Sequence, residues 1–265
     1  MPSVSNIAIG ANMAAAAANK ARHGMNESIA RLSTGVRAMY GGDAAGYSMG
    51  QQTKAVSQSY AQATRNIEDA MSFAQQGESV LLEVANLAQR LRELAITADN
   101  AAILDANQEA ALNSEAALIG DTITAVLDKT DFNTFEVVDS AAAKEYTIAY
   151  ASLTANTTEV GPNVSIASQA GITAAAGAEA NADAVLAGVA EGLGNLAADL
   201  TALKAHQGAA SATSANMAAA GARLIDTDFA LETASLTKNA ILNQAALAMA
   251  AQANSAQSSI LSVLQ

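Results

Sequence analysis

Proline occurs at only two positions in the chain, Pro2 and Pro162. Proline is the strongest breaker of helices, whereas alanine, which supplies much of the 51% hydrophobic content, is the best helix former. Aromatic residues make up only 3% of the chain and Trp is absent, so there are few large side chains to fill a thick core. The sequence therefore predicts long helices with thin interfaces between them.

The charge and the reactive side chains exclude several functional classes. A formal net charge of −12 disfavours nucleic acid, whose phosphates require clustered Lys and Arg. Because Cys is absent, the chain has no disulfide, Cys-based zinc site or thiol nucleophile. The only imidazoles are His23 and His206, and surface helix positions account for both. We therefore expect no enzyme activity, no metal site and no cofactor.

Membrane insertion is also disfavoured. A transmembrane helix needs about 20 mostly apolar residues, and the longest clean apolar run in the C-terminal segment is Ala245–Ala251. Residues 1–19 carry no positive side chain, whereas a Sec signal peptide begins with a cationic region. We expect neither a membrane span nor a cleaved signal peptide.

Both ends of the chain lack charge. Residues 1–19 and 239–265 contain no Asp, Glu, Lys or Arg, so every charged residue lies between Lys20 and Lys238. A helix exposed to solvent normally carries charged residues on its outer face. The sequence therefore predicts that both ends are covered by partners.

Heptad spacing indicates what kind of partner covers the ends. Met25, Ile29, Leu32 and Val36 are separated by four, three and four residues, which is the spacing of a coiled-coil seam. In the last segment, a single heptad position holds Leu242, Met249, Ala256 and Val263. We predict self-assembly through apolar side chains of the two ends, namely Ile7, Met25, Ile29, Leu32, Val36, Leu242, Met249, Leu261 and Leu264.

The middle of the chain also has a helical pattern. The Gly41-Gly42-Asp43 cluster separates the first helix from a predicted helix over residues 44–98, which would be roughly 80 Å long. A compact globule of this chain length would be only about 45–50 Å across, so the pattern favours a rod. Further helices are predicted over residues 104–129 and from about 178 to the C-terminus, with kinks near Gly208 and Gly221.

Three short segments between these helices have β character. Residues 132–138, 145–150 and 163–166 are rich in β-branched or aromatic side chains. The predicted fold is mainly α, a long helical hairpin or coiled-coil rod with a small β-hairpin region near 131–170. We predict two domains. Residues 1–43 with 224–265 form an inner coiled-coil domain, and residues 44–223 form a helical rod domain.

Motifs at both ends resemble those of bacterial flagellins. Residues 31–37 (Arg-Leu-Ser-Thr-Gly-Val-Arg), 43–46 and 90–95 match the N-terminal half in order and spacing. Residues 226–232, 252–254 and 260–264 are similar to the C-terminal signature. The resemblance covers about residues 3–138 and 178–265. Residues 139–177 stand where flagellins carry a variable outer insertion, so the chain resembles a short form that lacks the variable outer domains.

The resemblance implies a structural subunit that polymerises into the bacterial flagellar filament for swimming motility. It implies type III export to an extracellular, secreted location, with other flagellin subunits, an export chaperone, and cap and junction proteins as partners. The family surface that a vertebrate innate immune receptor reads matches Arg90, Leu94 and Glu115 here. Exposed hydroxyls at Thr157, Thr158 and Ser165 are candidates for O-glycosylation.

Two other classes of protein share these sequence features. A hook-filament junction protein has similar ends, but it does not polymerise indefinitely. A chemoreceptor-type signalling helical bundle is also Ala-rich and heptad-patterned, although it requires a membrane anchor and has no strands.

Overall fold

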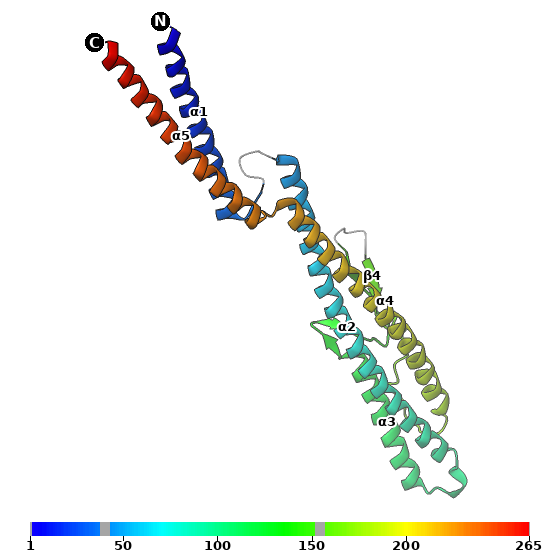
Figure 1. The fold of residues 1–265 in the computed structure, drawn as a ribbon. Helices are drawn as coiled ribbons and strands as arrows, with labels where there is room; N and C mark the ends of the chain where they lie inside the picture. Colours follow the sequence, from blue (N-terminus) through cyan, green and yellow to red (C-terminus); the bar gives the residue numbers. More distant parts are fainter. Residues whose placement is uncertain (1, 38–42, 152–156, 265) are drawn as a thin grey trace. The chain divides into compact units, whose positions relative to one another are not determined.

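A computed structural model describes residues 2–37, 43–151 and 157–264 (Figure 1). The described helices are α1 (Pro2–Thr34), α2 (Ala44–Ala98), the short 3-10 helix η1 (Ala101–Ile103), α3 (Ala106–Asp128), α4 (Glu179–Ile225) and α5 (Phe229–Leu264). The described strands are β1 (Asp131–Phe132), β2 (Phe135–Glu136), β3 (Tyr146–Ala149) and β4 (Thr157–Val160). The predicted mainly α class with a small β region is confirmed.

The chain divides into two compact units. The terminal unit comprises residues 1–55 and 217–265, and the middle unit comprises residues 56–216. The division therefore falls inside α2 and α4. The domain boundaries predicted from sequence, 43/44 and 223/224, lie near helix ends instead, and they stay a prediction.

In the terminal unit, α1 and α5 lie side by side and run in opposite directions, with the N- and C-termini at the same end (Figure 1). Small residues allow this close packing. Ala18, Ala21 and Ala246 are buried between the helices. A Cβ atom on Gly24 would lie only 2.7 Å from the Nδ2 atom of Asn239. Alanine and glycine thus let the two backbones approach where larger side chains would hold them apart.

A short backbone pairing joins the segment that follows α1 to the connection between α4 and α5. Gly35 has a φ of +70°, the left-handed conformation that commonly ends a helix. The N–H of Thr227 donates to the Gly35 carbonyl at 2.9 Å, and the N–H of Arg37 donates to the Ile225 carbonyl at 2.7 Å. Val36 forms an antiparallel bridge with Asp226. Val36 therefore follows the helix and is not part of a helical seam.

The break in the returning helical segment is set by Asp228. Its side chain accepts hydrogen bonds from the backbone N–H groups of Ala230 and Leu231, at 2.9 and 3.2 Å, and so caps the start of α5. Gly208 and Gly221, where kinks were predicted, lie inside the uninterrupted helix α4. A capped restart, and not either glycine, therefore interrupts the returning helical segment, and kinks at the two glycines stay a prediction.

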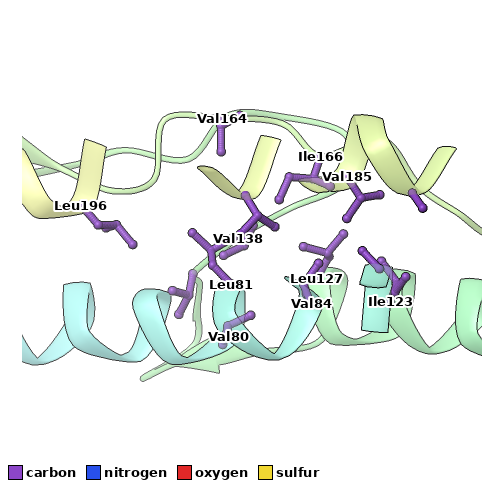
Figure 2. Packing of buried hydrophobic residues seen from close by; sticks show 14 of the residues in the cluster. Val80, Leu81, Val84, Ile123, Leu127, Val138, Val164, Ile166, Val185 and Leu196 are labelled. Carbon is purple, nitrogen blue, oxygen red and sulfur yellow. The ribbon is translucent and has the colours of Figure 1, made fainter. Parts of the chain in front are cut away.

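The core of the middle unit lies among α2, α3 and α4. Figure 2 shows side chains from the three helices and the connecting segments meeting in one layer, including Val80, Leu81, Val84, Ile123, Leu127, Val138, Val164, Ile166, Val185 and Leu196. A Cβ atom on Gly192 would lie 2.8 Å from Val164 and 2.9 Å from Leu81, so glycine is needed for this close contact. The core is continuous but thin.

Two of the predicted helices agree closely with the structure. Residues 44–98 form α2 with the predicted bounds. The helix predicted over 104–129 is observed as Ala106–Asp128. Its start is fixed by a capping box, in which Asp105 accepts from the Gln108 backbone and the Gln108 side chain accepts from the Asp105 backbone.

The β region consists of two small antiparallel hairpins among the described residues. In one, β1 pairs with β2 through a turn in which Asn133 and Thr134 both have positive φ. In the other, β3 pairs with β4, so that Tyr146 lies opposite Val160. The strand predicted at 163–166 is absent from this described segment, where Val164 and Ile166 are buried without strand pairing. The strand that pairs with β3 is instead Thr157–Val160, which has a more polar sequence.

Candidate assembly surface

The packed face of α1 differs from the predicted seam. The stripe that faces α5 passes through Ala18, Ala21 and Ser28, all buried, with Met25 and Leu32 half-buried beside it. Ile29 is 49% exposed. The heptad seam that includes Ile29 is therefore not the surface that packs on α5, because a stripe of small residues one position away allows closer contact; the role of Ile29 in self-assembly stays a prediction. The regular spacing of Ala18, Ala21, Gly24 and Ser28 was the available signal.

The predicted heptad position on α5 is also not buried against α1. Leu242 is 48% exposed and Met249 is 65% exposed. Among the described side chains of α5, the buried ones are instead Glu232 and Ala246. The internal contact of α5 thus uses a small and a polar residue, and the larger apolar side chains are left outside.

Together these residues define what we call the outer apolar face of the terminal unit. We use this name for all the exposed large hydrophobic residues of α1 and α5, which lie on more than one side of these helices: Ile9, Met13, Ile29, Phe229, Leu231, Ile241, Leu242, Leu247 and Met249. The side chains of Ile7, Leu261 and Leu264 lie outside those that the structure describes. Single exposed hydrophobic residues are ordinary, but such an accumulation on two paired helices is typical of a protein–protein contact surface.

An open groove of about 730 Å³ runs between α1 and α5 on this unit. Its lining includes Ala21, Leu242 and Met249, with Lys20 and Lys238 beside them. The groove therefore combines an apolar floor with charged groups of both signs, since Glu27 also lines it, an arrangement suited to another amphipathic helix.

A polar contact lies between the same two helices. The Nη1 atom of Arg31 is 3.6 Å from Oε1 of Glu232. Glu232 is nearly buried, and its Oε1 atom makes no hydrogen bond, as is also true of Thr227 Oγ1 and Asn243 Oδ1. A buried carboxylate is costly without a partner, so this ion pair favours one alignment of α1 against α5. This ion pair was not predicted, because the residues next to Arg31 and Glu232 in the sequence give no sign that the two side chains meet.

Charge is divided unevenly between the two units. The terminal unit has seven Lys or Arg and five Asp or Glu, a net charge of +2. The middle unit has six and twenty, a net charge of −14. The unit with the outer apolar face is therefore nearly neutral, and the strongly acidic unit is the one suited to remain in water.

The three residues predicted as an immune-receptor surface are close together on α2 and α3. Arg90 donates to Glu115 at 2.7 Å and to Glu93 at 3.2 Å. The hydrogen bond that Arg90 donates to Glu115, and next the one it donates to Glu93, raise the pKa of Arg90. Leu94 is buried in the core of the middle unit. Arg90 and Glu115 thus present polar surface, while Leu94 is not accessible to a partner.

The predicted glycosylation residues lie on β4 and in the segment after it. Thr157 and Ser165 are exposed, whereas Thr158 is half-buried opposite Ile148. A bulky modification would fit more easily around the exposed Thr157 and Ser165 than around the half-buried Thr158.

In the part of the chain that the structure describes, no three or more His, Cys, Asp or Glu side chains gather as metal ligands would. None of the described helices combines the length and hydropathy that a membrane crossing requires.

Comparisons with known proteins agree at both ends of the chain. The bacterial flagellin N-terminal helical region matches residues 5–143, and the bacterial flagellin C-terminal helical region matches residues 180–264. The chain is 32% identical over 256 residues to a flagellin of Halalkalibacterium halodurans, covering 90% of this chain and 91% of that protein. It is 27% identical over 280 residues to a flagellin of Bacillus subtilis, covering 90% and 92%.

A solved structure, the crystal structure of Bacillus cereus flagellin, is similar with a TM-score of 0.38 and 19% identity, covering 58% of this chain and 88% of that one. The two family regions span nearly the whole sequence; β1 and β2 lie inside the first region, and β3 and β4 lie between the two. The protein is thus a helical structural protein that assembles with copies of itself, and it is not an enzyme. The chain belongs to the bacterial flagellin family, as a structural subunit of the flagellar filament in a short form without an outer domain.

Proposed function

We propose that the outer apolar face of the terminal unit is the surface through which this flagellin binds its neighbours in the filament. The observation that carries this proposal is the exposure of Ile29, Leu242 and Met249 on helices that pack against each other through other, smaller residues. Burial of a large apolar side chain contributes about 1.5–3 kcal/mol, so covering the face would strongly favour assembly. Repeated contacts of this heterologous kind extend into a helical polymer.

The remaining self-assembly residues enter the proposal in different ways. Met25 and Leu32 are half-buried against α5 and would complete contacts at the edge of the face. Val36 would act through the bridge to Asp226 that holds the two helix ends together. Ile7, Leu261 and Leu264 extend the same apolar character toward the two termini. We also propose the predicted division of the chain, in which the inner domain (residues 1–43 with 224–265) carries the assembly surface and residues 44–223 form the rod domain.

Export by the flagellar type III route to an extracellular filament is part of the proposal, with a chaperone, cap and junction proteins as transient partners. An apolar face that is exposed before assembly would need cover, which an export chaperone supplies. Recognition by an innate immune receptor would involve Arg90 and Glu115, since these side chains are exposed as an ion pair.

The outer apolar face can be tested with two charge substitutions, Ile29→Asp and Met249→Asp. Both sites are exposed, so the substitutions leave the internal packing intact. We expect filaments of the natural sequence in electron micrographs and only short oligomers from either variant. Ser211→Asp is the matched control, because it adds the same charge at an exposed position of α4 in the middle unit. Normal filaments from Met249→Asp would contradict the proposal.

The junction-protein reading makes a different prediction for the same preparations. A junction protein forms short assemblies that stop growing, whereas a filament subunit continues to lengthen while free subunits remain. Removal of residues 254–265 should abolish growth and leave the middle unit folded, as measured by circular dichroism.

A further inference from the structure

The middle unit contains an open apolar cleft of about 310 Å³ beside α2 and the two hairpins. Its lining includes four of the nine aromatic side chains of the chain, Phe73, Phe132, Phe135 and Tyr146. Their rings pack edge to face, with centroids 5.2 to 5.9 Å apart. In a chain so poor in aromatic residues, this concentration around a cleft open to solvent indicates a contact site.

The walls of the cleft are held in place by polar contacts. The Tyr146 hydroxyl donates to the Glu136 carbonyl at 2.9 Å. The Lys144 ammonium lies 2.6 Å from the Glu136 carboxylate and 2.7 Å from that of Asp139. These contacts tie β2 to β3, so the cleft is formed before anything enters it. A preformed cleft binds with a smaller entropic cost.

The same unit carries an apolar side chain of suitable size. Ile103, on η1 between α2 and α3, is 79% exposed, more than any other large hydrophobic residue whose exposure is described. Its N–H donates to the Asn100 carbonyl at 3.1 Å, and the N–H of Gly177 donates to Asp99 at 3.2 Å. The Ile103 side chain is therefore presented to solvent on a turn that is held by hydrogen bonds.

Ile103 cannot reach the cleft of its own chain. Phe73 and Ala98 belong to the same helix, α2, and are 25 residues apart, or roughly 37 Å at 1.5 Å per residue. A protruding residue and a complementary cleft that cannot meet within one molecule can meet only between copies. Such a contact is heterologous, and it extends an open filament when the rotation between copies does not close a ring.

We propose that Ile103 of one subunit inserts into the aromatic cleft of another copy in the filament. This inference rests on the proposed self-assembly. A single side chain buries far less than the roughly 1,200 Å² of a stable interface, so the contact does not hold a dimer in solution. It fixes the stagger between copies that the terminal units already hold together. Asp69 at the cleft and Asp99 and Asp105 beside Ile103 repel one another, so salt strengthens the contact.

Disulfide crosslinking tests the proposal cleanly, because the chain has no cysteine. Ile103→Cys and Thr147→Cys are made as separate variants, since both sites are exposed and Thr147 lines the cleft. The two proteins are mixed, assembled into filaments and oxidised. We expect mixed dimers on a non-reducing gel, at a yield at least several-fold above that of each variant alone.

Leu118→Cys with Thr147→Cys is the matched control, since Leu118 is a similarly exposed apolar residue on the side of α3. A second measurement compares Ile103→Asp with Leu118→Asp. We expect the critical concentration for assembly to rise about tenfold in the first variant only. Filaments in which the Ile103 pair crosslinks no better than the Leu118 pair would overturn the inference and leave self-assembly standing. Absence of filaments from the natural sequence would overturn both.

Discussion

The Arg31 guanidinium lies 3.6 Å from the Glu232 carboxylate, and Glu232 is only 9% exposed between α1 and α5. Removing one member of such a pair leaves the other charge buried without compensation. We expect Arg31→Ala to destabilise the paired terminal helices by about 1–3 kcal/mol, below the range for fully buried pairs because Arg31 is partly exposed. The measurement is hydrogen exchange of α1 and α5 amides in assembled filaments, together with the temperature of depolymerisation.

Two controls separate this effect from simple loss of a side chain. Glu27→Ala removes only the exposed partner of Arg31, 4.0 Å away, and should change little. The double variant Arg31→Met with Glu232→Met should recover most of the stability, because no charge is left buried. If the double variant were as unstable as Arg31→Ala, burial of an unpaired charge would not be the cause.

Gly50 is a second position where the packing depends on a single atom, because it leaves no room for a Cβ atom. A Cβ atom there would overlap the side chain of Ile225, within the terminal unit. Gly50→Ala should therefore destabilise the protein by about 1–3 kcal/mol, and Ile225→Ala in the same chain should relieve part of the loss. Gly194→Ala is the matched control, since its Cβ would meet nothing within 4 Å. That change should stabilise α4 by about 0.5–1 kcal/mol in urea unfolding, because alanine favours helix more than glycine does.

How far the sequence could predict the fold depends on the size of the side chains involved. The bounds of α2 followed from a long regular pattern of large apolar residues between clear breakers. The α1–α5 interface did not, because a heptad rule seeks large residues such as Ile29, and the real contact uses Ala18, Ala21 and Gly24. Strand β4 was missed because Thr157–Val160 is polar and is recognised as a strand only once paired with β3. Self-assembly was predictable, and the internal contact between α1 and α5 was not.

The acidic middle unit predicts how assembly responds to salt. Neighbouring copies each bring a net charge of −14 on this unit, and such charges repel over a Debye length of about 10 Å at 0.1 M salt but about 3 Å at 1 M. We expect the critical concentration for filament growth to fall as NaCl is raised, as measured by sedimentation. The triple variant Glu78→Gln, Asp121→Asn and Glu191→Gln, at three exposed positions, should show a lower critical concentration at low salt and a weaker salt dependence. Identical salt dependence in both proteins would contradict this explanation.

Asp199 predicts how stability changes with pH. Its carboxylate is half-buried and accepts a hydrogen bond from the Gly161 N–H at 3.0 Å, and burial raises its pKa above the ordinary value of 3.8. Because the folded state binds this proton more tightly than the unfolded state, the charged group destabilises the fold at neutral pH. That penalty falls as the pH drops through the raised pKa, and it is gone below about pH 3.8.

Asp199→Asn removes the charge but keeps an oxygen that can accept from Gly161. We expect a higher melting temperature than the natural protein at pH 7 and convergence of the two near pH 3.5, measured by circular dichroism. Asp199→Ala loses the acceptor as well, so it should be less stable than Asp199→Asn at both pH values. A destabilised Asp199→Asn with the same deficit at pH 7 and pH 3.5 would show that the hydrogen-bond geometry, rather than the buried charge, governs this site.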